Sequence, residues 1–136
     1  MRRVLREAGI LATLALLPAL VSGVAQLKRH TLPALKEGEI SVALAKQWGA
    51  KVLWVDTRSR AKFEHKHIPD AVLLNADEWE VLVAKFLDEW DPEKAIVVYG
   101  DGTGDNAANV ALRLKEELKL DGVWILQGGW DAWTQQ

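Results

Sequence analysis

The residue types best suited to chemistry lie in one glycine-rich stretch in the last third of the chain. Residues 98–108 read VYGDGTGDNAA, in which an apolar strand pattern ends at Tyr99, glycines alternate with polar residues, and a helical pattern follows. The backbone N–H groups of such a loop and the positive end of the following helix suit an anion or an anionic nucleophile. In open α/β sheets, binding sites gather at this carboxyl edge of the strands. The candidate binding residues are Gly100, Asp101, Gly102, Thr103, Gly104, Asp105 and Asn106.

The lack of cysteine narrows the chemistry that this loop can perform. None of the 136 residues is a cysteine, which excludes disulfides, thiolate metal ligands and cysteine nucleophiles within the chain. The loop carries two carboxylates, Asp101 and Asp105, and each would repel an anionic ligand by about 1–4 kcal/mol, depending on the local dielectric. One hypothesis is that a carboxylate serves as base or nucleophile. Another is that Asp105 or Asn106 caps the following helix.

Three other chemistries fit this loop poorly. The motif of haloacid dehalogenase phosphatases needs a nucleophilic aspartate where Tyr99 stands. A dinucleotide loop would place Asp101 against the pyrophosphate. A calcium-binding EF-hand loop counted from Asp101 has Leu112 in the position of the bidentate glutamate. An improvised cation site made by Asp101, Thr103 and Asp105 stays open.

The elements that position the loop follow an alternating pattern of short strands and helices from Glu39 onward, which predicts an α/β fold with a largely parallel sheet. Apolar runs typical of buried parallel strands cover residues 52–55, 72–74, 95–99 and 123–126. Helices are predicted over residues 41–48, 59–65, 105–118 and 129–134, and from Asp77 to the break at Asp91–Pro92.

Caps and apolar spacing define these helices. Ser41 is suited to cap the first helix and Gly49 to end it. In the helix from Asp77, one face carries Trp79, Leu82, Val83, Phe86 and Leu87, and in the helix from Asp105 the inward positions are Val110, Leu114 and Leu118. We expect the seven tryptophans to serve packing.

The N-terminal segment is apolar and uncharged from Ala8 to Leu27, and arginines precede it at positions 2, 3 and 6. About 20 apolar residues can span a bilayer as a helix, and the arginines favour a cytoplasmic N-terminus. We therefore expect residues 1–27 to be a signal anchor, or a signal peptide cut near Ala25. A core helix is disfavoured because the segment has no polar face. Residues 28–38 read as a linker and residues 39–136 as one domain.

Charge and location together indicate the kind of partner. The formal net charge is −2, and after residue 25 there are 14 basic and 18 acidic side chains, which argues against nucleic acid. Either reading of the N-terminal segment sends the domain to the extracytoplasmic (periplasmic) side. It would be attached to the membrane through residues 8–27, or secreted after cleavage. A membrane or extracytoplasmic protein is then the expected partner.

Four stretches together resemble the rhodanese (sulfurtransferase) domain family. They are VLWVDTRS at residues 52–59, KFEHKHIPDA at 62–71, IVVYGDGTGDN at 96–106 and LQGGWDAW at 126–133. The resemblance runs from about Ile40 to Trp133. It implies a single rhodanese-like domain with a mostly parallel five-stranded sheet flanked by helices, preceded here by an N-terminal hydrophobic helix.

The resemblance also implies roles for individual residues. The catalytic cysteine of the family, which carries sulfur as a persulfide, falls on Gly100, and Asp105 stands where an arginine often meets the anionic donor. No catalytic residue is therefore assigned. Asp56 and Arg58 would stabilise the strand end near the loop, and His67 stands where the family has a structural histidine. The implied function is a non-catalytic module that binds a partner protein or small ligand; the alternative is an enzyme that uses Asp101 or Asp105.

Around His67 the chain departs from the family. Lys66 and Asp70 occupy positions where glycine is usual, and Lys66 would adopt a left-handed conformation at a cost that glycine avoids. His65 and His67 have no third ligand nearby in the sequence, so we expect no metal site, and no cofactor is implied.

Overall fold

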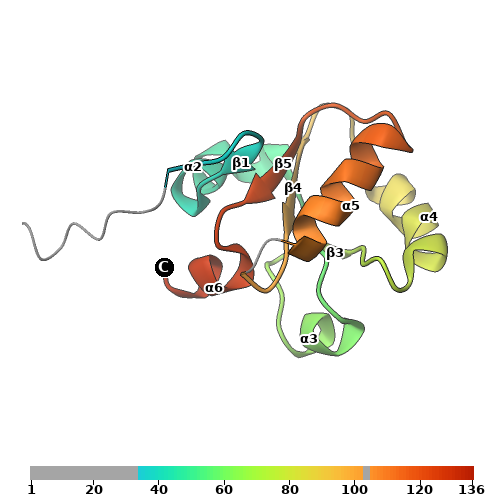
Figure 1. Cartoon of the computed structure of the whole chain (residues 1–136), viewed down its shortest axis with the longest axis horizontal. Helices are drawn as coiled ribbons and strands as arrows, with labels where there is room; N and C mark the ends of the chain where they lie inside the picture. The colour runs from blue at the N-terminus through green and yellow to red at the C-terminus, as the bar shows by residue number, and fades with distance from the viewer. Residues whose placement is uncertain (1–33, 103–104) are drawn as a thin grey trace, which may run out of the picture. The chain divides into compact units, whose positions relative to one another are not determined.

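Five parallel strands form the centre of the computed structural model, which describes residues 34–102 and 105–136 (Figure 1). The order across the sheet is β1-β5-β4-β2-β3, and all four neighbouring pairs are parallel. This confirms the predicted α/β class and the five-stranded sheet. The strands are β1 (Glu39–Ile40), β2 (Val52–Asp56), β3 (Val72–Leu73), β4 (Ala95–Tyr99) and β5 (Val123–Leu126).

Helices connect the strands. They are α2 (Val42–Trp48), the short 3-10 helix η1 (Gly49–Lys51), α3 (Arg60–His65), α4 (Trp79–Glu89), α5 (Asp105–Glu116) and α6 (Gly129–Thr134). The predicted cap of α2 is confirmed, because the Ser41 hydroxyl accepts a hydrogen bond from the Leu44 N–H at 3.2 Å. Gly49 ends that helix with a φ of +56°, a conformation that glycine adopts without strain.

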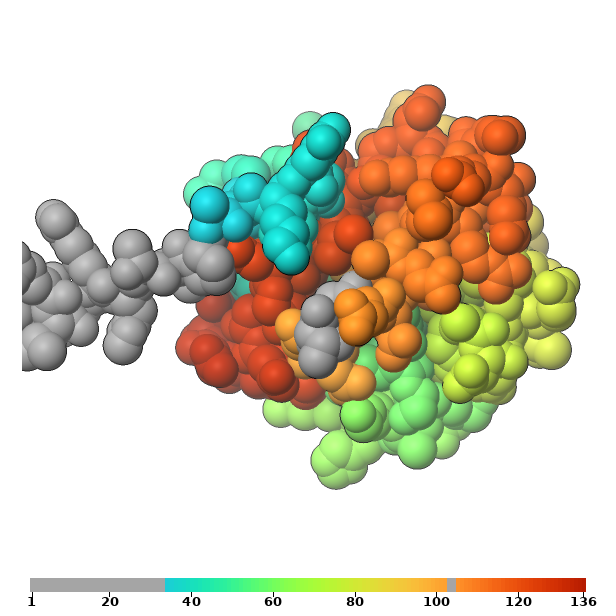
Figure 2. Space-filling model, viewed as in Figure 1, coloured from blue at the N-terminus to red at the C-terminus, as the bar shows by residue number. Residues whose placement is uncertain are grey.

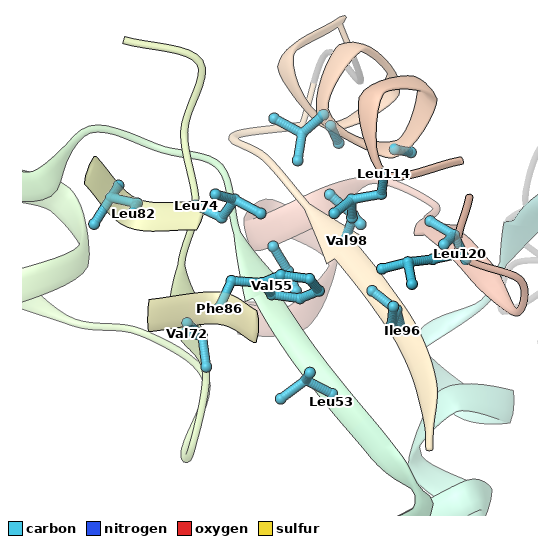
Figure 3. Close-up of a cluster of buried hydrophobic side chains, with 14 of the residues drawn as sticks. Leu53, Val55, Val72, Leu74, Leu82, Phe86, Ile96, Val98, Leu114 and Leu120 are labelled. Atoms are coloured by element: carbon cyan, nitrogen blue, oxygen red, sulfur yellow. The ribbon is translucent and has the colours of Figure 1, made fainter. Parts of the chain in front are cut away.

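The strand residues alternate between two hydrophobic clusters, one on each face of the sheet. On one face the cluster includes residues of α4 and α5 packed on Leu53, Val55 and Val98 (Figure 3). On the other face the cluster includes Trp54 and Tyr99 with residues of α2 and α6. Because successive side chains of a strand point to opposite faces, two helical layers cover one sheet. All seven tryptophans belong to these clusters or pack against them, as the sequence predicted.

Several boundaries differ from the prediction. The sequence did not locate β1, which is only two residues long and pairs with β5. Helix α4 begins at Trp79 rather than Asp77, and the buried Asn75 side chain accepts a hydrogen bond from the Glu78 N–H at 2.8 Å. Leu87 was wrongly placed on the buried face, since it is 43% exposed.

The N-terminal anchor or signal peptide predicted at residues 1–27 lies outside the described residues, as does most of the 28–38 linker. Within the described ranges, no helix is long and apolar enough to cross a membrane.

Candidate functional site

The carboxyl end of β2 carries a buried ion pair. The Arg58 Nη2 lies 2.8 Å from Asp56 Oδ2, and Arg58 Nε also donates to this carboxylate. Asp56 is fully buried and Arg58 is 4% exposed. The pair is stable in this environment because every carboxylate oxygen accepts a hydrogen bond. The proposed stabilising role of these two residues at the strand end agrees with this geometry.

Tyr99, the last residue of β4, joins the same network. Its hydroxyl donates to Asp56 Oδ2 at 2.8 Å and accepts from the Ile68 N–H at 3.1 Å. Burial raises the pKa of Tyr99, and the nearby Asp56 charge adds to this effect. Burial alone would lower the pKa of Arg58, but its bonds to Asp56 outweigh burial and raise it. Tyr99 therefore stays a neutral donor and Arg58 stays charged.

The Arg58 guanidinium connects three segments at this edge of the sheet. Its Nη2 donates to the Lys66 carbonyl at 2.7 Å, which holds the turn after α3. Its Cζ lies 4.2 Å from the ring centre of Trp130 in α6, a cation–π distance. Arg58 thus positions the wall of the site as well as stabilising the end of β2.

At the end of β4, the backbone of Gly100 is hydrogen-bonded to α6, but the residue has no side chain. The Trp130 N–H donates to the Gly100 carbonyl at 2.8 Å, and Thr57 binds the preceding carbonyl, that of Tyr99. A Cβ at residue 100 would lie 3.3 Å from Thr57 Oγ1 and 3.7 Å from the Ala107 backbone nitrogen. The position is buried and near the first turn of α5, and it has room for a small side chain.

The Asp101 side chain is directed at a cation. Its Oδ1 lies 2.9 Å from Lys62 Nζ, and the two side chains are 45% and 56% exposed. Asp105 is the first residue of α5, where a carboxylate is favourable beside the helix N-terminus. Asp105 and Asn106 both lie in the first turn of α5, whose start borders residues outside the described ranges, so the cap by either residue stays a prediction. Gly102 is described, whereas the predicted site residues Thr103 and Gly104 lie outside the described residues.

The segment around His67 differs from the prediction in one respect. Lys66 is extended, with a φ of −163°, so it carries no left-handed strain. Asp70 adopts the left-handed conformation instead, with a φ of +65°, which aspartate tolerates better than most residues. The His67 ring stacks on Phe63 at 4.0 Å, and its Nδ1–H donates to the Phe63 carbonyl at 2.7 Å. These contacts agree with a structural role for His67.

A pocket of about 380 Å³ opens between α3 and α6 at the carboxyl edge of the sheet. Figure 1 places both helices at this edge, and Figure 2 shows both on the same side of the molecule in this view. The residues that line the pocket are Arg58, Lys62, His65, Lys66, Asp101, Trp130 and Thr134. Within the described ranges, no three histidine or carboxylate side chains come together to hold a metal ion.

The comparisons with known proteins agree with this architecture. The family model described as the rhodanese-like domain matches residues 40–136. The chain belongs to the rhodanese-like domain family. No curated protein matches the chain in sequence.

Solved structures show the same fold. A rhodanese-related protein from Thermoplasma volcanium is 16% identical with a TM-score of 0.58, covering 71% of this chain and 90% of its own. A rhodanese-like domain from Anabaena sp. is 23% identical with a TM-score of 0.56, covering 74% and 75%. EanB, solved with ergothioneine covalently linked to a persulfide cysteine, is 27% identical with a TM-score of 0.57, covering 74% of this chain and 26% of EanB.

In this rhodanese-like domain, the structure brings only part of the predicted site together. Arg58 and Asp101 line the pocket, whereas Asp56 lies fully buried behind Arg58. Lys62 and Lys66 were not predicted as pocket residues. A signal was present, because basic residues recur every four positions at 58, 62 and 66, close to the repeat of a helix.

Proposed function

We propose that this rhodanese-like domain is a non-catalytic binding module for a partner protein or small ligand. The observation that carries the proposal is Gly100. The family resemblance places the catalytic cysteine there, the backbone around Gly100 is tightly held, and no other residue of the chain can supply a thiolate. Because the backbone at Gly100 is hydrogen-bonded in place while the nucleophile is missing, we infer that the fold serves binding rather than catalysis.

Sulfur transfer from thiosulfate to cyanide tests the proposal directly. We expect the purified full chain to show the uncatalysed rate only. Transfer above that rate would overturn the non-catalytic assignment. The neighbour EanB, which is 27% identical, was solved with a persulfide cysteine, so sulfur transfer is the activity to test first.

A gain-of-function variant tests whether the scaffold is intact. Gly100→Cys should be accommodated, because residue 100 is not in a left-handed conformation and its Cβ has only one tight contact, to Thr57 Oγ1. We expect its thiol to react with an alkylating reagent and its thiolate to take the sulfane sulfur of thiosulfate as a persulfide, with release of sulfite, at a rate reduced by charge repulsion from Asp101 and Asp105. Gly100→Ala is the matched control and should do neither. A thiol at position 100 that stays unreactive in the folded chain would contradict the proposed correspondence with the catalytic position.

An enzyme using the loop carboxylates is supported less well. A catalytic carboxylate usually lies in a closed environment that perturbs its pKa. Asp101 is 45% exposed and ion-paired with Lys62. Asp101→Asn should therefore leave any activity found in the chain unchanged.

We further propose that the domain is held on, or released to, the extracytoplasmic side. The uncharged segment from Ala8 to Leu27 and its preceding arginines support this proposal. If the domain is attached, alkaline carbonate extraction should leave the chain in the membrane pellet and protease added to spheroplasts should digest it; if it is released, it should be found in the periplasmic or culture fraction. A chain found intact in the cytoplasmic fraction would contradict the proposal.

A further inference from the structure

A second pocket adjoins the one beside the loop. It has a volume of about 390 Å³ and shares Lys66, Trp130 and Thr134 with the first pocket. It extends past Pro69 and Trp133 to Lys46 of α2. We call the two pockets together the basic groove. It continues well beyond the loop that carries the family chemistry.

The charge of the basic groove is opposite to that of the rest of the domain. Between residues 34 and 136 the chain has 18 acidic and 12 basic side chains. The groove is lined by four of those basic side chains and a single carboxylate, Asp101. The basic side chains are Lys46, Arg58, Lys62 and Lys66. Positive charge is therefore concentrated in one place on an acidic surface.

Two of these cations are already neutralised within the domain. Arg58 is paired with buried Asp56, and Lys62 is paired with Asp101. Lys46 and Lys66 form no ion pair within the described part of the chain, and both residues line the second pocket. Carboxylates of a ligand would therefore find their partners at these two lysines.

The aromatic side chains of the groove add an apolar surface between the charges. Trp130 and Trp133 are both half-buried and both line the second pocket. Lys46 Nζ lies 4.7 Å from the ring centre of Trp133, a cation–π distance. A ligand that spans the groove would contact charge and indole together, and tryptophan is among the residues enriched at protein interfaces.

We infer that the basic groove binds an extended acidic peptide segment of a partner protein, with carboxylates at Lys46 and Lys66 and an apolar residue on Trp130 and Trp133. This inference rests on the proposed binding role and specifies its partner. The cations come from separate elements and line two adjoining pockets, so one small oxyanion cannot satisfy them all. The net negative charge of the domain would repel a polyphosphate chain more strongly than a peptide whose charges are spaced by neutral residues.

Titration of the full chain in mild detergent with an acetylated peptide of alternating glutamate and leucine tests the inference. The control peptide has glutamine at each glutamate. We expect saturable binding of the first peptide, weakened with increasing salt, and at least tenfold weaker binding of the second. In NMR spectra the indole N–H signals of Trp130 and Trp133 should shift, while that of Trp79, buried on the opposite face, should not.

Matched variants locate the binding. Lys46→Gln with Lys66→Gln should weaken binding of the glutamate peptide at least tenfold. Lys51→Gln with Lys85→Gln, which removes two exposed lysines outside the groove, should change it less than twofold. Equal loss in both double variants, equal affinity for both peptides, or binding that inorganic sulfate or anionic phospholipid vesicles abolish at equal charge concentration would each overturn the inference. The sulfur-transfer assay is independent of these measurements, so failure of the non-catalytic assignment and failure of the peptide site are distinguishable.

Discussion

The ends of β2 and β4 lie next to each other in the sheet but are built in opposite ways. At the end of β2, Asp56 and Arg58 are buried and form an ion pair. Asp56 also accepts a hydrogen bond from the Tyr99 hydroxyl, while Arg58 binds the Lys66 carbonyl and lies over the ring of Trp130. After β4, Gly100 presents no side chain, and Asp101 makes an exposed ion pair. The groups that stabilise this edge of the sheet are therefore separate from the loop that begins at Gly100.

The largest expected effect comes from breaking the β2 end. Asp56→Ala leaves the buried Arg58 charge without its carboxylate and the Tyr99 hydroxyl without its acceptor, so we expect a loss of about 3–5 kcal/mol in the free energy of unfolding. Urea denaturation of the full chain followed by tryptophan fluorescence measures it. Asp88→Ala, an exposed carboxylate of α4, is the control and should change stability by less than about 0.5 kcal/mol. Similar losses in both variants would remove the distinction between the two regions.

Gly129→Ala should have the next largest effect, because the added methyl group would push α6 away from the end of β4. A Cβ at residue 129 would lie 2.5 Å from the Gly100 carbonyl oxygen, and the φ of +52° is itself strained for alanine. The matched control is Gly122→Ala, whose φ is +68° with nothing within 4 Å of the added Cβ. We expect the control to lose about 1 kcal/mol from backbone strain and Gly129→Ala to lose clearly more. Equal midpoints in urea would show that α6 moves freely away from the loop.

A smaller effect is expected at the β4 end itself. Gly100→Ala adds a methyl group with one tight contact, 3.3 Å to Thr57 Oγ1, in a backbone conformation that alanine accepts. Reduced freedom of the unfolded chain offsets this contact, so the free energy of unfolding should change by less than about 1 kcal/mol. Differential scanning calorimetry beside the wild type measures the change. A loss as large as that of Asp56→Ala would mean that glycine is retained for packing rather than in place of a nucleophile.

The smallest effect is expected from the exposed ion pair. Lys62→Met keeps the apolar stem and removes the charge opposite Asp101. Exposed pairs contribute about 0–1 kcal/mol and are screened by salt, so any difference from the wild type should disappear in 1 M NaCl. Denaturation at low and high salt tests this. A large, salt-independent loss would show that Lys62 belongs to the framework.

Much of the fold could be predicted from local sequence, because its signals are local. The strand runs, the Ser41 cap and the Gly49 stop each depend on a few adjacent residues, and the structure confirms them. Strand β1 was missed because two residues carry no periodicity and form a strand only by pairing with β5. The role of Asn75 was missed: its hydrogen bond with the Glu78 N–H is local, whereas its bond to the Arg58 carbonyl depends on how the chain after β3 lies beside the end of β2.

The lack of cysteine, visible in the sequence, excludes thiolate chemistry by this chain's own residues. Hydrophobic spacing also predicts the order of the helices and of the strands after β1. The contact of Lys62 with Asp101, the left-handed conformation of Asp70 rather than Lys66, and the shared groove of Lys46 and Lys66 follow from the folded structure alone. These residues come from different elements, and parallel strand packing, which is not a local property, brings them together.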